Sequence, residues 1–259
     1  MDLGLKGKWA LVCGASAGLG YACALSLARE GVNLVVASRT PDRIEPSARR
    51  IAEQTGATVI PVVADVSRPE DRERLVAAVP QVDILITNAG GPSPGDFRDF
   101  RHEEWLAAIE TNMLAPLEMI RLTIDPMIAR RFGRIVNITS GAVKSPVDML
   151  VLSNGPRAGL TGAVSGIARQ VAQHNVTINN VLPGKFDTDR LRSNNTNRAR
   201  KSGRTFEEEV ALQVATIPAR RLGTAAEFGD ACAFLCSEQA GYITAQNLLL
   251  DGGLFPGLL

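Results

Sequence analysis

The sequence predicts an α/β fold in which one parallel sheet is covered by helices on both faces. Short apolar runs typical of buried strands alternate with segments of helical periodicity, and glycines or prolines stand between many of them. The 259 residues, 45% of them hydrophobic, are enough to bury one sizeable core. We therefore expect a single domain that spans residues 1–259.

The elements of the first half follow from this alternation. Expected strands cover residues 8–15, 33–38, 58–66 and 82–90, where stretches such as "WALVC" and "NLVVAS" are mostly apolar. Expected helices cover residues 19–31, 42–56 and 69–79. The first of these helices has apolar residues at helical spacing and a glycine stop at Gly31.

The second half continues the pattern. A helical segment over residues 103–131 precedes a strand at 133–140, and we expect a break near Asp125 because Pro126 removes a backbone donor. A helix that ends near residue 174 leads to a strand at 176–184. A polar insertion, a helix at 225–237 and a strand at 247–253 complete the chain. We find no repeat and no linker rich in Pro, Gly or Ser that would divide it.

Charge and cysteine content argue against several classes of function. The formal net charge is +1 and basic residues are scattered among acidic ones, so we expect no nucleic-acid partner and no membrane contact. Four cysteines form no CxxC pair and no ligand cluster with the two histidines, which argues against a metal site. No stretch reaches the ~18 apolar residues of a membrane span, and no cleavage signal follows the N-terminus. We expect a cytoplasmic protein that acts on small molecules.

A glycine-rich turn joins the first expected strand to the first expected helix. The stretch "GASAGLG" contains Gly14, Gly18 and Gly20, with Ser16 and Leu19 between them. Glycines let the backbone approach a phosphate closely, and the following helix offers free N–H groups and the positive end of its dipole. An ordinary tight turn can have the same composition, so neighbouring motifs must decide.

Five motifs in register supply that context: "CGASAGLG", "NAG" at 88–90, "NITS" ending at Ser140, "PGKFDT" at 183–188 and "YITAQNLLLDGG". With them the chain resembles the short-chain dehydrogenase/reductase family over essentially its whole length, and most of all its β-ketoacyl-acyl-carrier-protein reductases. The resemblance implies a Rossmann-type, doubly wound parallel sheet of seven strands, a nicotinamide cofactor and a homotetramer. One departure is Cys13, where the family has threonine.

The cofactor expected from the resemblance is NADP(H) rather than NAD(H). The second strand ends in Ser38 and Arg39 and has no acid for a ribose hydroxyl, whereas the guanidinium suits a 2′-phosphate. A purely solvated Arg39 is the alternative. The resemblance also implies contacts with the adenine, the adenosine ribose and the nicotinamide end from Asp65, Val66, Asn88, Ala89, Gly90, Pro183, Gly184, Phe186 and Thr188.

The family's catalytic residues are only partly present. Ser140 matches its serine and Asn112 its asparagine, but Ser153 stands at the tyrosine position and Arg157 at the lysine position. Hydride delivery to a carbonyl creates an alkoxide that needs a hydrogen-bond donor and a proton source. Arg157 could bond the nicotinamide ribose and keep a positive charge nearby, and Ser153 could donate a hydrogen bond without easily releasing its proton.

Pro156 raises a structural alternative for Ser153. Proline is tolerated in the first helical turn, so we expect the helix to begin near residues 153–155 with Ser153 or Asn154 as its cap. Ser153 would then need no chemical role. Other proton donors could face the pocket or the solvent: Lys144, Asp148, Asp187 and Asp189.

The polar insertion, about residues 188–212, matches the family's substrate lid. Its basic residues would suit an anionic substrate such as a phosphopantetheine or CoA thioester, although a solvated mobile loop is the more ordinary explanation. Two functions remain: an NADP(H)-dependent oxidoreductase acting on a carbonyl or alcohol, including a β-ketoacyl thioester, or a catalytically impaired dinucleotide-binding protein that serves as a redox sensor or an assembly subunit. The basic residues of the insertion are Arg190, Arg192, Arg198, Arg200, Lys201 and Arg204.

Overall fold

The computed structural model of the chain describes residues 2–258 and confirms the predicted fold class. One sheet of seven parallel strands runs in the order β3-β2-β1-β4-β5-β6-β7. The strands are β1 (Trp9–Cys13), β2 (Asn33–Ser38), β3 (Val59–Val63), β4 (Ile84–Thr87), β5 (Gly133–Ile138), β6 (Val176–Pro183) and β7 (Asn247–Leu250).

The strand order reverses at β1. This strand pairs with β2 on one side, where Val12 is in register with Val36, and with β4 on the other, where Val12 is in register with Ile86. In open parallel sheets, ligands bind in the crevice beyond the carboxyl ends of the strands at such a reversal. The topology therefore places the site beyond the carboxyl ends of β1 and β4.

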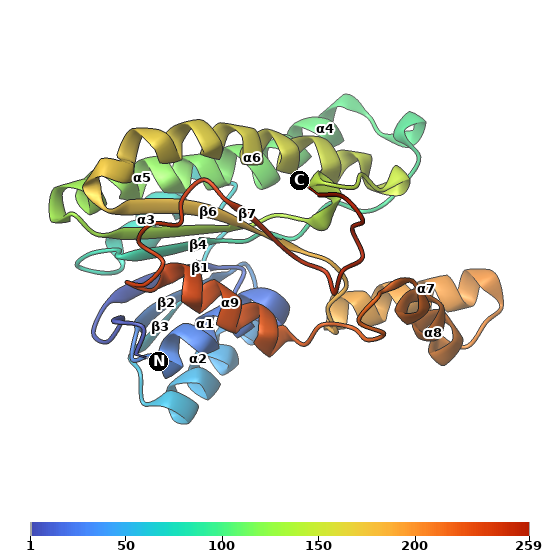
Figure 1. Cartoon of the computed structure of the whole chain (residues 1–259), viewed down its shortest axis with the longest axis horizontal. Coiled ribbons are helices and arrows are strands. Elements are labelled where there is room, and N and C mark those ends of the chain that lie inside the picture. Colours follow the sequence, from blue (N-terminus) through green and yellow to red (C-terminus); the bar gives the residue numbers. More distant parts are fainter. Residues whose placement is uncertain (1, 259) are drawn as a thin grey trace.

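Helices cover both faces of the sheet (Figure 1). Helices α1 (Gly18–Arg29), α2 (Pro41–Thr55) and α9 (Ala225–Cys236) pack over one core, in which Leu27 and Phe228 are fully buried. Helices α3 (Pro69–Ala77), α5 (Ala115–Arg130) and α6 (Val151–Val171) pack over the other, around residues such as Leu75 and Leu160. Because helices occupy both faces, the central strands β1, β2 and β4 read as continuous apolar runs.

The helical break predicted near Asp125 is wrong. Helix α5 continues through Pro126, and the interruption lies instead at a π-helical turn, Glu110–Leu114, between α4 (His102–Ile109) and α5. Pro126 is exposed, so the carbonyl that loses its intrahelical donor there can bond water. The π turn contains Asn112, and such turns are frequent at functional sites.

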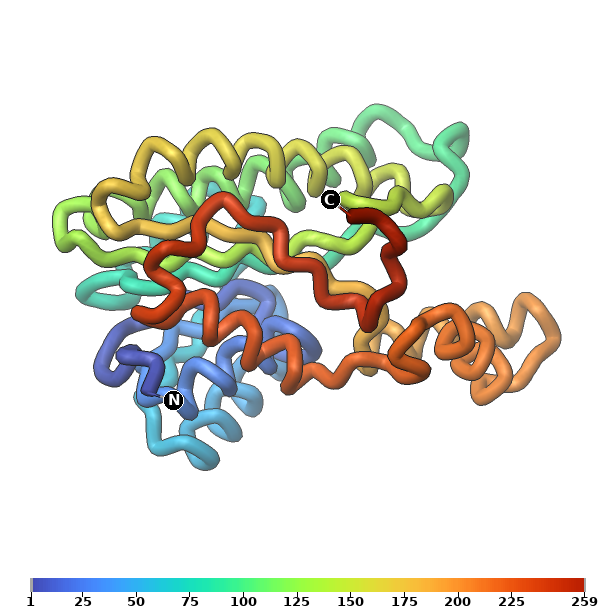
Figure 2. The backbone as a smooth tube through the Cα atoms, viewed as in Figure 1, coloured from blue at the N-terminus to red at the C-terminus, as the bar shows by residue number. Residues whose placement is uncertain are grey.

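The polar insertion is not the mobile loop that its composition favoured. It forms α7 (Asp189–Ser202) and α8 (Phe206–Thr216), which project from the body of the molecule (Figure 2). Thr188 and Thr205 cap the two helices through their hydroxyls, and Gly203 ends α7 at a φ of 73°. Caps at both junctions and the buried pair Asn195–Gln213 between the helices explain why a polar segment is helical here.

Within residues 2–258, no helix has the length and apolar character that crossing a membrane requires. Over the same range, no three His, Cys, Asp or Glu side chains gather into a group that could hold a metal ion. The four cysteines are free and buried.

Candidate functional site

A cleft of about 820 Å³ lies at the carboxyl ends of the strands. It runs along the loops that follow β1 to β6 and reaches the start of α7. Its size suits an elongated small molecule. Of the predicted site residues, Gly20 and Asn112 do not line it, whereas its lining includes Gly14, Ser16, Gly18, Leu19, Ser38, Arg39, Asp65, Val66, Asn88, Ala89, Gly90, Ser140, Ser153, Arg157, Pro183, Gly184, Phe186 and Thr188.

The glycine turn forms a backbone cradle at the start of α1. Gly14 and Gly18 have φ angles of 60° and 58°, which residues other than glycine rarely adopt. A Cβ on Gly20 would overlap the carbonyl oxygen of Gly14, so Gly20 serves close packing rather than ligand contact. The first turn of α1 has no side-chain cap, which leaves its N–H groups for a ligand. This open cradle fits a pyrophosphate.

Cys13 and Asn88 hold the glycine turn against β4. The Asn88 side chain donates to the carbonyl oxygen of Gly14 at 3.2 Å. Cys13 is buried beside the backbone N–H of Asn88, and burial raises the pKa of its thiol to about 12. The thiol therefore stays neutral. It lies beside Asn88, at the end of β4, where the threonine of the family pattern would make its contact.

Basic residues surround the end of the cleft beyond β2 and β3. Arg39 is 74% exposed and lies 4.0 Å from the carboxylate of Asp65. Burial pushes the pKa of Asp65 up, but hydrogen bonds from Ser67 and the charges of Arg39 and Arg68 outweigh it and lower that pKa. Arg43, four residues after Arg39 at the start of α2, also lines the cleft. Its position in the first turn of the helix that follows β2 is the sequence signal that could have revealed it.

Ser140 lies directly after β5 and faces the cleft. Its Oγ accepts a hydrogen bond from the backbone N–H of Ala142 at 3.1 Å. Among residues 2–258, no acceptor takes its hydroxyl proton. The hydroxyl is thus held in place as an acceptor and keeps its proton for a ligand in the cleft.

The prediction that α6 begins at residues 153–155 is wrong. The helix begins at Val151, directly after a short 3₁₀ turn, and neither Ser153 nor Asn154 caps it. Asn154 instead donates to the carbonyl oxygen of Val147 at 2.9 Å. Pro156 lies inside this helix, and the hydrogen bonds from the adjacent Arg157 to the carbonyl oxygens of Ile138 and Thr139 hold that turn against the sheet. Ser153 therefore lies within the helix and turns toward the cleft.

Arg157 joins Ser153 to the ends of the strands. Its Nε donates to Ser153 Oγ at 3.1 Å, and its Nη1 donates to the carbonyl oxygens of Ile138 and Thr139 at 3.0 and 2.8 Å. Its Nη2 lies 3.4 Å from the carbonyl oxygen of Ala89. Four N–H bonds to uncharged acceptors hold the guanidinium across β4 and β5, so it cannot swing freely toward a ribose.

The charge of Arg157 is not compensated within residues 2–258. No carboxylate lies within ion-pair distance of it there. Burial, and secondly the nearby charge of Arg190, lower the pKa of Arg157 from 12.5 to about 10. The guanidinium therefore remains cationic at neutral pH, and it is not a proton donor.

Asn112 lies behind the cleft rather than in its wall. It is 4% exposed, and its Nδ2 donates to the carbonyl oxygen of Ala108 at 3.3 Å. Its Oδ1 is buried and has no hydrogen-bond partner among residues 2–258, and the same is true of the Thr139 hydroxyl. Buried polar atoms of this kind are commonly satisfied by internal water, so the π turn is suited to hold one.

The segment after β6 closes the far end of the cleft. Phe186 packs edge-on against Phe228, with ring centroids 5.2 Å apart. Thr188, the cap of α7, contributes the next part of the lining. A Cβ on Gly184 would come within 2.7 Å of Asp251 Cα, so the backbone there must be glycine.

Most of the alternative proton donors face away from the cleft. Lys144 lies 5.6 Å from the ring centroid of Phe255, and Asp187 pairs with Arg192 at 2.8 Å. Asp148 is also outside the lining, whereas Asp189 is part of it. The start of α7 adds residues that the sequence did not single out as cleft residues: Arg190, Leu191, Ser193 and Asn194.

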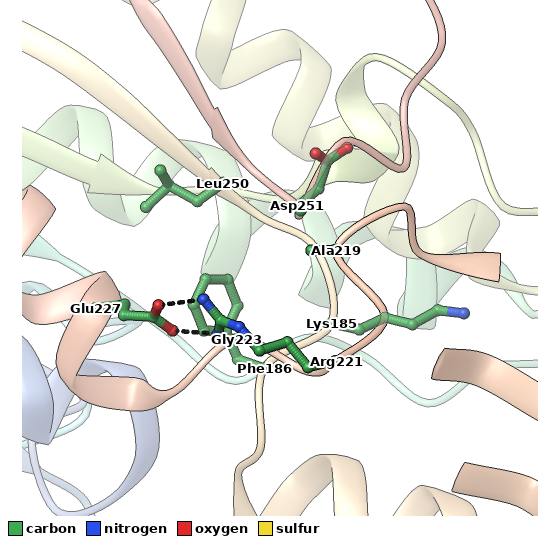
Figure 3. Close-up of a pocket in the computed structure, with 9 residues that line it drawn as sticks. Lys185, Phe186, Ala219, Arg221, Gly223, Glu227, Leu250 and Asp251 are labelled. Carbon is green, nitrogen blue, oxygen red and sulfur yellow. Dashed lines mark hydrogen bonds and ion pairs between the residues drawn. The ribbon is translucent and has the colours of Figure 1, made fainter. Parts of the chain in front are cut away.

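A second cavity, of about 170 Å³, lies beside Phe186 and Gly223 (Figure 3). Arg221 at its edge forms a two-pronged ion pair with Glu227, and Asp251 accepts from the N–H groups of Gly253 and Phe255. Because these charged groups are already satisfied, this cavity is a weaker candidate than the cleft.

Comparison with known proteins places these features in a family. The family described as "Enoyl-(Acyl carrier protein) reductase" matches residues 14–255. The NADPH-dependent reductase BacG of Bacillus subtilis is 34% identical over 95% of this chain and 97% of its own length. The 3-oxoacyl-[acyl-carrier-protein] reductase FabG of Escherichia coli is 32% identical over 98% of this chain and 99% of its own.

A solved structure agrees with these sequence matches. The L-sorbose reductase of Gluconobacter frateurii, complexed with NADPH and L-sorbose, superposes with a TM-score of 0.95 and 28% identity. The alignment covers 100% of both chains.

Proposed function

The chain belongs to the short-chain dehydrogenase/reductase family, and we propose that it is an NADPH-dependent reductase that transfers hydride to a carbonyl substrate, with Ser140 as the family's serine and with Ser153 and Arg157 in place of its tyrosine and lysine. One observation carries this proposal. Two hydroxyls, Ser140 and Ser153, line the same cleft, and each is held as an acceptor with its proton free.

The cofactor site is supported by the two halves of the cleft. The open glycine turn suits the pyrophosphate, and Arg39 and Arg43 suit a 2′-phosphate at the end of β2, where no acid competes for the ribose. The segment from Pro183 to Thr188 then borders the nicotinamide end. When bound there, NADPH supplies the hydride that the carbonyl carbon receives.

Proton supply falls to the two serines. Both hydroxyls donate hydrogen bonds to the carbonyl oxygen, whose negative charge grows as the carbon is reduced. Ser153 passes its proton to this oxygen and the resulting serine alkoxide lies beside the Arg157 Nε–H, which stabilises it. Serine and the product alcohol are similar acids, so the adjacent guanidinium favours the transfer. Water entering the cleft then returns a proton to the serine alkoxide and leaves as hydroxide.

The test is stopped-flow mixing of the NADPH complex with ketones, aldehydes and β-ketoacyl thioesters while the absorbance of the reduced nicotinamide is followed. We expect oxidation of NADPH that Ser140→Ala slows by about 10²–10³-fold, the cost of one oxyanion donor. Ser153→Ala should slow it by about 10²–10⁴-fold, the contribution of one positioned proton donor. Ser165→Ala is the matched control, because Ser165 lies on the same helix and bonds only the carbonyl oxygen of Thr161.

A dinucleotide-binding protein with impaired catalysis is the second candidate, because neither Ser153 nor Arg157 is a ready proton donor at neutral pH. The wild-type protein would then bind NADPH tightly but turn over no substrate, and the double variant Ser153→Tyr with Arg157→Lys would also show no turnover. This result would favour a redox sensor or an assembly subunit. Turnover that is insensitive to Ser140→Ala would contradict the catalytic assignment.

Three features remain predictions from the sequence. They are a single domain with the α7–α8 segment as a lid, a homotetramer, and a cytoplasmic location. We propose that Asn112 holds a water molecule, which is supported by its Oδ1, an atom without a hydrogen-bond partner among residues 2–258.

A further inference from the structure

Two arginines share a small space at the reacting end of the cleft. Arg190, in the first turn of α7, donates from Nη2 to the carbonyl oxygen of Gly91 at 3.1 Å. A Cβ placed on Gly91 would lie 3.3 Å from Arg190 Nη2 and 3.6 Å from Arg157 Nη2. Both guanidinium groups therefore lie on the same side of Gly91, in the wall of the cleft.

No carboxylate balances these two charges within the described residues. The acceptors of Arg157 are Ser153 Oγ and backbone carbonyls, and those of Arg190 are the carbonyl oxygens of Gly91 and Pro92. Asp189 also lines the cleft, yet it forms no ion pair with either arginine, and its charge acts on Arg192.

Two other basic residues of the α7–α8 segment are paired, and Arg198, Arg200 and Lys201 do not line the cleft. Arg192 bonds Asp187 through two nitrogens at 2.8 Å each, and Arg204 bonds Glu209 at 3.1 Å. The segment is therefore not a general anion-binding surface at these positions. Its uncompensated charge in the cleft is concentrated on Arg190, next to the buried guanidinium of Arg157.

A buried cation without a counter-ion is unfavourable, and an anion placed beside it removes that penalty. Both the burial of Arg157 and the repulsion from Arg190 lower the Arg157 pKa, so both would be relieved by one bound anion. The anionic groups of the cofactor have other binding positions in this cleft, at the glycine turn and at Arg39 and Arg43.

We propose that Arg157 and Arg190 together bind a carboxylate of the substrate, and that the substrate is a 2-oxo or 3-oxo acid. Arg157 Nε holds Ser153 Oγ, whereas its Nη2 lies beside Gly91, on the side of Arg190. A carbonyl oxygen bonded to Ser153 and a carboxylate bonded to Arg157 Nη2 thus lie near neighbouring nitrogens of one guanidinium, which suits a substrate in which the two groups are adjacent or one carbon apart. This assignment rests on the proposed reductase function and specifies its substrate class.

The primary test is calorimetric titration of the NADPH-loaded protein with oxamate, a 2-oxo acid analogue, and with its neutral counterpart oxamide. Oxamate should bind at least tenfold more tightly than oxamide. Arg190→Leu should reduce oxamate affinity at least tenfold and leave oxamide and NADPH affinities unchanged, while Arg190→Lys retains part of it. Arg200→Leu is the matched control, because Arg200 is an exposed arginine of α7 that does not line the cleft.

Three results would overturn the proposal: oxamate and oxamide binding equally or not at all, an oxamate preference that survives Arg190→Leu, or an NADPH affinity that falls as much as the oxamate affinity in Arg190→Leu. The last result would assign the two arginines to a cofactor phosphate.

A kinetic measurement separates this proposal from the reductase function itself. The value of kcat/KM for 2-oxo acids should exceed that for their methyl esters at least tenfold, and Arg190→Leu should remove most of this difference. Esters reduced as well as acids would contradict the carboxylate site while supporting the reductase. A clear oxamate preference with no turnover of any carbonyl compound would support the site and contradict the reductase.

Discussion

At the residue scale, the buried charge of Arg157 lowers the stability of the fold and is available to bind a ligand. The pKa of Arg157 is lowered from 12.5 to about 10 in the folded protein. Between these two pH values Arg157 is protonated in the unfolded chain and deprotonated in the folded chain. The buried charge therefore lowers the free energy of unfolding at neutral pH, by about 3 kcal/mol from linkage. Such a cost is typical of functional sites, where an uncompensated charge serves a ligand.

Arg39 is the residue that should decide cofactor preference. We expect Arg39→Ala to weaken NADPH binding by about tenfold, because one largely exposed charge-assisted contact with the 2′-phosphate is lost, and to leave NADH binding unchanged. Fluorescence titration of both nucleotides measures this. Arg49→Ala, an exposed arginine of α2 outside the cleft, should change neither affinity. Equal losses for NADPH and NADH would show that Arg39 does not read the phosphate.

At the element scale, the start of α9 supports the segment that follows β6 and lines the cleft. Thr224 and Glu227 form a reciprocal capping box, and Glu227 also binds Arg221. The hydrogen bond from Arg221, followed by those from Thr224, lowers the pKa of Glu227 to about 2. The adjoining Gly223 pairs with Phe186, so the cap helps to hold the segment that borders the nicotinamide end.

Removal of this cap should show a defined pH dependence. A carboxyl with a lowered folded pKa stabilises the protein above its unfolded pKa of 4.5, and this stabilisation is lost as pH falls toward 2. We expect Glu227→Gln to lower the urea midpoint at pH 7 and to approach the wild-type midpoint between pH 4.5 and 2. Glu207→Gln, an exposed acid in the first turn of α8, should have little effect. A difference that does not change with pH would contradict this role.

At the scale of the whole molecule, one helical face has the features of an interface. Leu106 of α4 and Leu114 of the π turn are 52% and 42% exposed. Added Cβ atoms on Gly155, Gly162 and Gly166 of α6 would meet nothing within 4 Å. These surfaces support the homotetramer that the family resemblance implies.

Sedimentation velocity tests this assembly. We expect a species of about four times the 27.6 kDa chain mass at micromolar concentration. Leu106→Glu should shift it to smaller species, because an interface core does not accommodate an unpaired charge. Leu212→Glu is the control, since Leu212 is equally exposed but lies on α8. A wild-type monomer at this concentration would exclude the tetramer.

The sequence predicted the sheet well but not every helix boundary. Strand β2 begins and ends at the predicted residues, because an almost wholly apolar run between turn residues has few alternatives. The start of α6 and the continuity of α5 were mispredicted because both depend on prolines. The free-energy cost of a proline inside a helix depends on its tertiary surroundings. Pro126 is exposed to solvent, and Pro156 lies next to Arg157, which bonds the sheet; neither fact can be predicted from the local sequence.

The fold class, the family and more than half of the residues that line the cleft could be predicted from the amino-acid sequence. These follow from local patterns: apolar runs, glycines that permit close backbone approach, and motifs in register. Only the tertiary structure decided that Ser153 is held by Arg157, that Asn112 lies behind the cleft, and that Arg190 meets Arg157 beside Gly91. The reason is that hydrogen-bond partners and uncompensated charges depend on which distant strands and helices the fold brings together.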